Sequence, residues 1–375
     1  VAHPAALSLL MPMLLEGTSR HSGAEFAEIL EYNGAWKATE TARHQTSLSV
    51  FMLNKSAETI FRLVSELVSD SVFPESTLAA LCERQAAQAD LRQQKVDTIS
   101  RQEAMRMAYG TSHPFSRIVA PDELRAVTRD DVMNMFERIV RGYPPEIYLS
   151  GQISGTMEEL AARIFGNLKF DSPAAQELQP VPAAPLAKSA TRRIERPDSL
   201  QTAVTIMLPV AGMSHRHPDY ELLRVAVTAL GGYFGSRLMS NIREEKGYTY
   251  GISAYLSSTA EGAFVTIATQ TDNRHAGALL DEVWLEIGRL AQEPPTEEEM
   301  EVVRRTMASN LAGILDSPFT VMDYHRQVES LGLDHTRFAH QLKAVESATP
   351  DDIRLMAERY LIGAPRLTAL AGHEA

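Results

Sequence analysis

The sequence predicts an α+β protein that consists of two duplicated domains. Three observations support this prediction: an internal repeat, strand and helix patterns that recur in each half, and a proline- and alanine-rich segment between the halves. Strands and helices occur in runs, so we expect each half to be a mostly antiparallel sheet packed with helices.

The repeat is clearest in two short segments. TRDDV at 128–132 recurs as TPDDI at 349–353, an offset of 221 residues. Two further landmarks, prolines that open predicted helices, repeat in the same order with offsets of 221 and 214. A period of this length indicates duplicated domains, since the repeats of a solenoid are only about 20–50 residues long.

Periodicity predicts the elements within each half. Apolar residues alternate with polar ones along 47–52, and similarly along 202–208, which is typical of half-buried strands. Apolar residues at helical spacing predict helices over 57–69 and 278–290.

The domain borders follow from composition. Residues 171–190 lack hydrophobic periodicity and are rich in proline and alanine, so they are expected to form a linker. The first domain is then 1–170 and the second is 191–375.

The first half lacks a counterpart of one strand. Val1 aligns with His215, whereas the second half has its predicted strand at 202–208, before that point. We therefore expect the N-terminal strands of the first domain to be missing and residue 1 not to be the natural start. The compartment, periplasm or cytoplasm, stays open.

Composition excludes several classes of protein. The chain of 375 residues has 36 basic and 48 acidic side chains, a net charge of −12, which argues against a nucleic-acid partner. It has no apolar run of the about 18 residues that a membrane span needs, so a soluble protein is expected. Its single cysteine, Cys82, excludes a disulfide framework and is interpreted as a core thiol.

One motif stands out as a candidate for chemistry. A helix is expected to end at Gly247, with Arg243 in its last turn and Tyr250 on the strand that follows. Gly231-Gly232 and the run SRL at 236–238 precede it. The turn can bring the guanidinium and the phenol together. By spacing alone, a solvated arginine and a core tyrosine remain an alternative.

This segment resembles the second-domain signature of the pitrilysin/insulysin (inverzincin) family of zinc peptidases, in which an R-x6-Y pair points at the active site. The first half resembles the family at EGT (16–18), LEYNGA (30–35) and HPFSR (113–117). The resemblance covers nearly the whole chain. It implies duplicated α+β domains that form half of a clamshell.

The family's zinc motif, H-x-x-E-H, is absent. Anchored on Gly17-Thr18, its positions fall on the segment 8–12, which places Ser8, Met11 and Pro12 where the family has its two histidines and glutamate. The third ligand comes from an E-x6-E pair, which here is Glu83 and Asp90. These degenerate positions predict that this chain binds no zinc.

No other cluster replaces the zinc site. His215 and His217 are interpreted as a surface segment that enters a helix. The sequence contains neither a nucleophile-elbow motif nor a phosphate-binding loop.

The resemblance implies the partner of an HxxEH-containing subunit. That heterodimer would hydrolyse peptides, with zinc bound by the partner. Arg243 and Tyr250 would bind the substrate carbonyl and stabilise the oxyanion. The substrate strand would add to a sheet edge, whose counterpart here is Gly34, Ala35 and Trp36.

Two alternatives remain. A purely structural or binding subunit of the same fold would use Arg243 and Tyr250 for packing only. A standalone peptidase would need an unrecognised metal site and would hold nearly stoichiometric zinc.

Overall fold

The computed structural model describes residues 3–42, 45–170 and 188–374. The chain divides into two compact units, of which the first comprises 1–92 and 118–178 and the second comprises 93–117 and 179–375.

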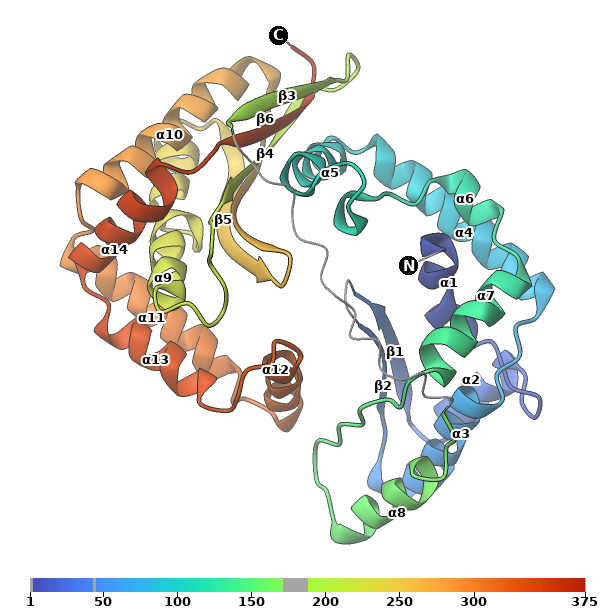
Figure 1. The fold of residues 1–375 in the computed structure, drawn as a ribbon. Coiled ribbons are helices and arrows are strands. Elements are labelled where there is room, and N and C mark those ends of the chain that lie inside the picture. Colours follow the sequence, from blue (N-terminus) through green and yellow to red (C-terminus); the bar gives the residue numbers. More distant parts are fainter. Residues whose placement is uncertain (1–2, 43–44, 171–187, 375) are drawn as a thin grey trace. The chain divides into compact units, whose positions relative to one another are not determined.

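The first unit has a two-stranded antiparallel sheet, β1 with β2, and its other described regular elements are helices (Figure 1). Its core surrounds helix α1, in which Leu9, Leu10 and Met13 are fully buried. Cys82 belongs to the same core, and burial raises the pKa of its thiol. The elements are α1 (Pro4–Leu14), α2 (Gly23–Tyr32), β1 (Trp36–Thr41), β2 (Thr46–Phe51), η1 (Asn54–Ser56), α3 (Ala57–Ser69), α4 (Glu75–Gln94), α6 (Pro121–Arg125), α7 (Arg129–Met135), η3 (Phe136–Arg141) and α8 (Gly155–Phe165).

The second unit is built on a five-stranded sheet in the order β3-β7-β4-β6-β5. Only β3 and β7 pair in parallel, and β5 is an edge strand. The strands are β3 (Ala190–Glu195), β4 (Gln201–Pro209), β5 (Thr249–Thr259), β6 (Gly262–Asp272) and β7 (Leu367–Gly372). The helices are α5 (Val96–Tyr109), η2 (Pro114–Ser116), α9 (Tyr220–Gly231), η4 (Met239–Glu245), η5 (Asn273–His275), α10 (Ala276–Gln292), α11 (Glu297–Gly313), α12 (Pro318–Ser330), α13 (Arg337–Ser347), α14 (Pro350–Ala357) and η6 (Glu358–Ile362).

Helices cover both faces of this sheet (Figure 1). On β4, Ile206 faces α9, α10 and α14, whereas the next residue, Met207, faces α5. This alternation follows from the two-residue period of a strand, because both faces of a central strand are buried.

Helix α5 belongs to the second unit, although the sequence analysis placed residues 93–117 in the first domain. Its apolar residues, among them Met107 and Tyr109, pack against Phe264 and Met207 of the sheet. The buried hydroxyl of Ser100 donates to the carbonyl oxygen of Ala369 at 3.0 Å. These contacts join residues far apart in sequence, so local patterns do not reveal them.

Most of the expected linker, 171–187, lies outside the described residues.

The capping geometry supports the duplication. Thr128 Oγ1 donates to Asp131 Oδ2 at 2.6 Å before α7, and Thr349 Oγ1 donates to Asp352 Oδ2 at 2.6 Å before α14. Both helices continue into a π-helical turn, η3 or η6. The strands expected at 47–52 and 202–208 and the helices expected at 57–69 and 278–290 are confirmed by β2, β4, α3 and α10.

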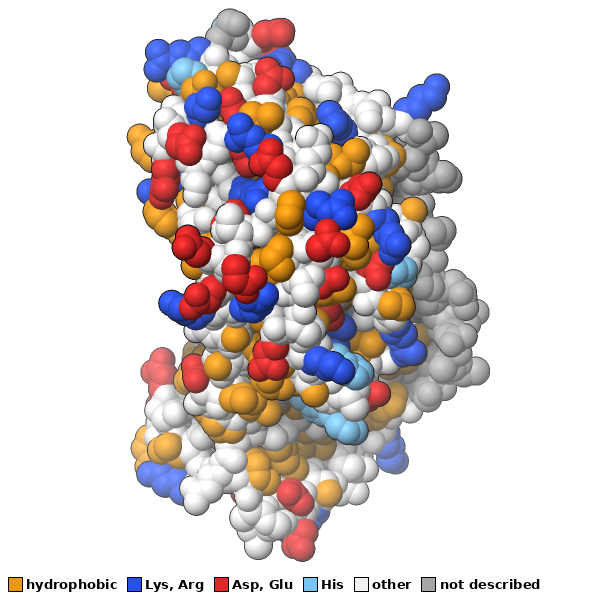
Figure 2. Space-filling model, turned by 90° about the vertical axis from the view of Figure 1, so that its left-hand side faces the viewer, with side chains coloured by type: hydrophobic (Ala, Val, Ile, Leu, Met, Phe, Trp, Pro, Cys, Tyr) orange, Lys and Arg blue, Asp and Glu red, His pale blue; other side chains and the backbone are white. Residues whose placement is uncertain are grey.

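The surface carries interspersed charges. On the face shown in Figure 2, basic and acidic side chains alternate and form no continuous basic region. Many of them pair locally, as in α14, where Arg354 contacts Asp351 at 2.8 Å and Glu358 at 2.9 Å. Among the described helices, none has the length and hydrophobicity that crossing a bilayer requires.

We expect Gly231→Ala to destabilise the protein by about 1–3 kcal/mol through overpacking. A Cβ at this position would lie 2.7 Å from the Cβ of Ala254 and 2.8 Å from its nitrogen. Gly288→Ala, inside α10 with no atom within 4 Å of the new Cβ, is the matched control. It should stabilise by about 0.5–1 kcal/mol through lower backbone entropy in the unfolded chain. Urea unfolding of both variants measures the difference, and a Gly231→Ala protein as stable as the original would contradict the close approach.

Candidate active site

Glycines place the segment that carries Arg243 and Tyr250. Helix α9 ends at Gly231, whose missing side chain lets the helix end lie directly against Ala254 of β5. After η4, Gly247 adopts φ +65°, a conformation that favours glycine, and the chain reverses into β5. The predicted helix end at Gly247 is confirmed.

Hydrogen bonds close the turn between Arg243 and Tyr250. The amide of Tyr248 donates to the carbonyl of Ile242 at 3.0 Å, and the amide of Lys246 donates to that of Asn241 at 3.0 Å. The turn therefore holds Arg243 and Tyr250 on adjoining elements. Within the described structure no hydrogen bond joins their side chains.

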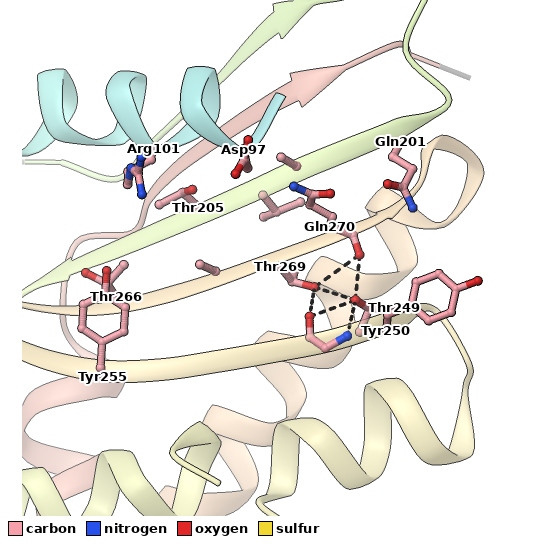
Figure 3. A pocket seen from close by; sticks show the side chains of 14 residues that line it. Asp97, Arg101, Gln201, Thr205, Thr249, Tyr250, Tyr255, Thr266, Thr269 and Gln270 are labelled. Atoms are coloured by element: carbon pink, nitrogen blue, oxygen red, sulfur yellow. Dashed lines mark hydrogen bonds between the residues drawn. The ribbon is translucent and has the colours of Figure 1, made fainter. Parts of the chain in front are cut away.

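Threonine hydroxyls fix the start of β5 (Figure 3). Thr249 Oγ1 donates to the carbonyl of Gln270 at 2.7 Å and accepts from Thr269 Oγ1 at 2.9 Å. The register of β5 with β6 shifts between Thr249 and Ile252, an irregularity that re-aims side chains on an edge strand. Tyr250 lies inside this irregularity.

Tyr250 is exposed, and Arg243 is partly exposed. The side chain of Tyr250 is 92% exposed, and its hydroxyl has no hydrogen-bond partner in the part of the chain that the structure describes. The guanidinium carbon of Arg243 lies 4.3 Å from the ring centroid of Phe234, and no described carboxylate forms an ion pair with it. A core tyrosine, the alternative that spacing left open, is therefore wrong for Tyr250.

A trough of about 520 Å³ begins at Tyr250 and extends between α5 and strands β4, β5 and β6 (Figure 3). Its lining includes buried Thr205 and Thr266, with Asp97 and Arg101 of α5 on one wall. The sequence analysis missed the residues of α5. Their helical spacing was visible in the sequence, but the docking of α5 on this sheet was not.

The expected substrate edge lies in the first unit. Gly34, with φ +61°, and buried Ala35 lead from α2 into β1. Trp36 is 56% exposed and stacks on Phe51 of β2 at a centroid distance of 4.0 Å. On its other side β1 pairs with no described strand, so the unpaired edge that strand addition needs is present.

The side chains at the family's zinc positions do not fit a zinc ion. Ser8 Oγ donates to the carbonyl of Ala5 at 2.7 Å, Met11 is buried in the core, and Pro12 has no side-chain donor atom. Among the described residues, no group of three His, Cys, Asp or Glu side chains has a metal-binding arrangement.

Two of the acidic residues on α4, Glu83 and Asp90, contact an arginine. Arg125 of α6 contacts Glu83 at 3.3 Å and Asp90 at 3.3 Å, and Asp122 at 3.0 Å. Their hydrogen bonds, that of Glu83 first, raise the pKa of the Arg125 guanidinium. The guanidinium of Arg125 therefore pairs with both carboxylates of the E-x6-E positions, from which the resemblance takes the third zinc ligand.

The two histidines at 215 and 217 have structural roles. His217 Nδ1 accepts from the amide of Asp219 at 3.1 Å just before α9. His215 Nε2 lies 3.0 Å from the carbonyl oxygen of Ser258. Both contacts stabilise the entry into α9, as expected from the sequence, although His215 is partly buried rather than at the surface.

Two family profiles match the chain. The profile described as "Insulinase (Peptidase family M16)" matches residues 8–115, and the profile described as "Peptidase M16 inactive domain" matches residues 126–307. Together they cover well over half of the chain. The chain belongs to the M16 peptidase family.

Several relatives of this M16 chain are named as peptidases. The uncharacterized zinc protease YmxG of Bacillus subtilis is 22% identical over 322 residues, 85% of this chain and 76% of that protein. An uncharacterized zinc protease of Streptomyces coelicolor is 20% identical over 97% of this chain and 80% of its own length. The probable mitochondrial-processing peptidase subunit beta of Schizosaccharomyces pombe is 24% identical over 61% of this chain and 50% of its own length.

Solved structures of bacterial proteins have the same fold. A peptidase M16 inactive domain from Pseudomonas fluorescens superposes with a TM-score of 0.83 at 21% identity, covering 99% of this chain and 89% of that chain. A protease from Helicobacter pylori gives 0.84 at 14% identity, covering 98% and 89%. The predicted α+β fold with two M16 domains is confirmed.

Burial lowers the pKa of His215, and the nearby Arg337 and Arg224 lower it further; together they outweigh the hydrogen bond to the Ser258 carbonyl, which raises this pKa. Unfolding frees this histidine to bind a proton near its ordinary pKa of about 6.5. The free energy of unfolding should therefore fall as the pH drops below about 6.5, by at most about 1.4 kcal/mol per pH unit for this group.

In His215→Gln this part of the pH dependence should disappear, whereas replacing the exposed His335 by Gln should leave it in place. Urea unfolding between pH 7.5 and 5.5 measures both variants. The same pH dependence in His215→Gln and in the unaltered chain would show that His215 is not held neutral.

Proposed function

We propose that this chain is the subunit of a heterodimeric M16 zinc peptidase that binds no metal. Its partner would be a homologous HxxEH-containing subunit, and its substrate an extended peptide. One combination of features carries the proposal: the side chains at the zinc positions cannot hold the ion, while Arg243 and Tyr250 are accessible on a rigid turn.

In this proposal zinc and the activation of water belong to the partner, and this chain acts on the substrate carbonyl. Arg243 has N–H donors that no described carboxylate occupies, and Tyr250 has a free hydroxyl donor. Both groups would donate to the carbonyl oxygen and then more strongly to the oxyanion of the tetrahedral intermediate. Donors that are fixed before the reaction stabilise this charge without reorganisation.

The rigidity of the turn supports this role. The threonine hydroxyls around Thr249 and the backbone bond between Tyr248 and Ile242 fix the elements from which both side chains extend. Among the relatives, the fission yeast protein is named as a subunit of a processing peptidase, which agrees with a heterodimer. The Gly34–Trp36 edge is then a distal surface for the peptide, away from the partner's zinc.

Activity should appear only when this chain is mixed with an HxxEH-containing partner, and not with either chain alone. Arg243→Ala and Tyr250→Phe should each lower the rate by about 10²–10³, because each removes one oxyanion donor. Hydrolysis of a quenched fluorescent peptide measures the rate. Arg305→Ala and Tyr143→Phe, two exposed positions elsewhere, are matched controls that should leave the rate unchanged.

Analytical ultracentrifugation of each mixture separates loss of catalysis from loss of assembly. If partner and mixture are equally active and both substitutions are without effect, the chain is a structural or binding subunit instead.

The isolated chain should retain well below one equivalent of zinc after exposure to excess metal and desalting. The reason is the donor set: Ser8, Met11 and Pro12 offer no imidazole or carboxylate, and Asp90 is paired with Arg125. Metal analysis by mass spectrometry gives the content. Nearly stoichiometric zinc, together with peptidase activity of the chain alone, would instead establish a standalone enzyme.

A further inference from the structure

The ring of Phe234 is exposed although phenylalanine is normally buried. Its side chain is 62% exposed, and the guanidinium carbon of Arg243 lies 4.3 Å from its ring centroid. An aromatic face within about 6 Å of a cation attracts it electrostatically. The contact accounts for an apolar ring at this place in the chain.

The backbone on both sides of Phe234 is fixed. The amide of Ser236 donates to the carbonyl of Tyr233 at 3.2 Å, which closes a tight turn around Phe234. The ring of Tyr233 packs against the core of the second unit, and its burial raises the pKa of its hydroxyl. On the other side, Arg237 binds Glu299 through two contacts, at 3.0 Å and 3.3 Å.

Arg237 and Arg243 differ in the partners that hold them. The side chain of Arg237 is 15% exposed. Arg243 has the ring of Phe234 and, in the described part of the chain, no carboxylate. A carboxylate would compete with a substrate for the donors of a guanidinium, whereas a ring contacts its face and leaves the N–H groups at its edge free.

We infer that Phe234 is a positioning residue that holds the Arg243 guanidinium by its face, so that its N–H edge is free for the substrate carbonyl. The inference rests on the proposed function of Arg243. Arginine loses much side-chain entropy when it is fixed, so holding it before the substrate binds removes part of that cost from the reaction.

Phe234→Leu tests the inference in the assembled heterodimer. It removes the ring and keeps an apolar side chain, so we expect kcat to fall about tenfold with KM nearly unchanged. Phe234→Trp restores an aromatic face and should recover most of the activity. Phe319→Leu, which alters another exposed phenylalanine in α12, is the matched control and should behave like the unaltered chain.

A second measurement reports on Arg243 directly. In a chain labelled with 15N-arginine, the Nε–Hε signal of Arg243 can be assigned by its absence in Arg243→Lys. Its heteronuclear NOE should fall in Phe234→Leu and return in Phe234→Trp. A purely structural role of Phe234 would change the unfolding midpoint and leave this NOE as it is.

The possible results separate the two ideas. If Arg243→Ala is inactive but Phe234→Leu keeps full kcat and the same NOE, the positioning role is overturned and the proposed function stands. If Arg243→Ala is fully active, the proposed function fails and the positioning role fails with it, whatever the NOE.

Discussion

The close approach of α9 to the edge strand β5 is the constraint on which the candidate site depends. Because Gly231 has no side chain, the end of α9 lies directly against Ala254 of β5. The connecting segment, residues 232–253, therefore starts and ends at the same point of the fold. This connecting segment contains the turn with Phe234, the π-helical segment η4 and the chain reversal at Gly247. The accessible side chains of Arg243 and Tyr250 are thus carried by one tightly packed junction.

The segment that the resemblance aligns with the zinc motif and the turn that carries Arg243 differ in their packing. In α1, Met11 and its apolar neighbours are buried, and Ser8 is bonded to the helix backbone. At the Arg243 turn, the aromatic side chains of Phe234 and Tyr250 are exposed, and Arg243 is partly buried. An exposed Phe and Tyr gain little from burial, so stability alone gives no reason for their presence.

Local signals explain which features the sequence could predict. Capping threonines, period-two strands, amphipathic helices and the glycine at 247 act within a few residues, and the structure contains them where the sequence places them. The docking of α5 was not predictable, because its contacts with Phe264 and Ala369 depend on the tertiary fold. For the same reason the trough beside Tyr250, with Asp97 and Arg101 on its wall, could not be derived from spacing.

Because α5 belongs to the second unit, the order of synthesis affects when its apolar face can be buried. Ser100 bonds to Ala369 across 269 residues of sequence, and β7, the strand that carries this partner, lies near the end of the described chain. During vectorial synthesis the apolar face of α5 emerges before Met207 of β4 and Phe264 of β6, which cover it, and before β7. Contacts of such long sequence separation form slowly and leave apolar surface exposed.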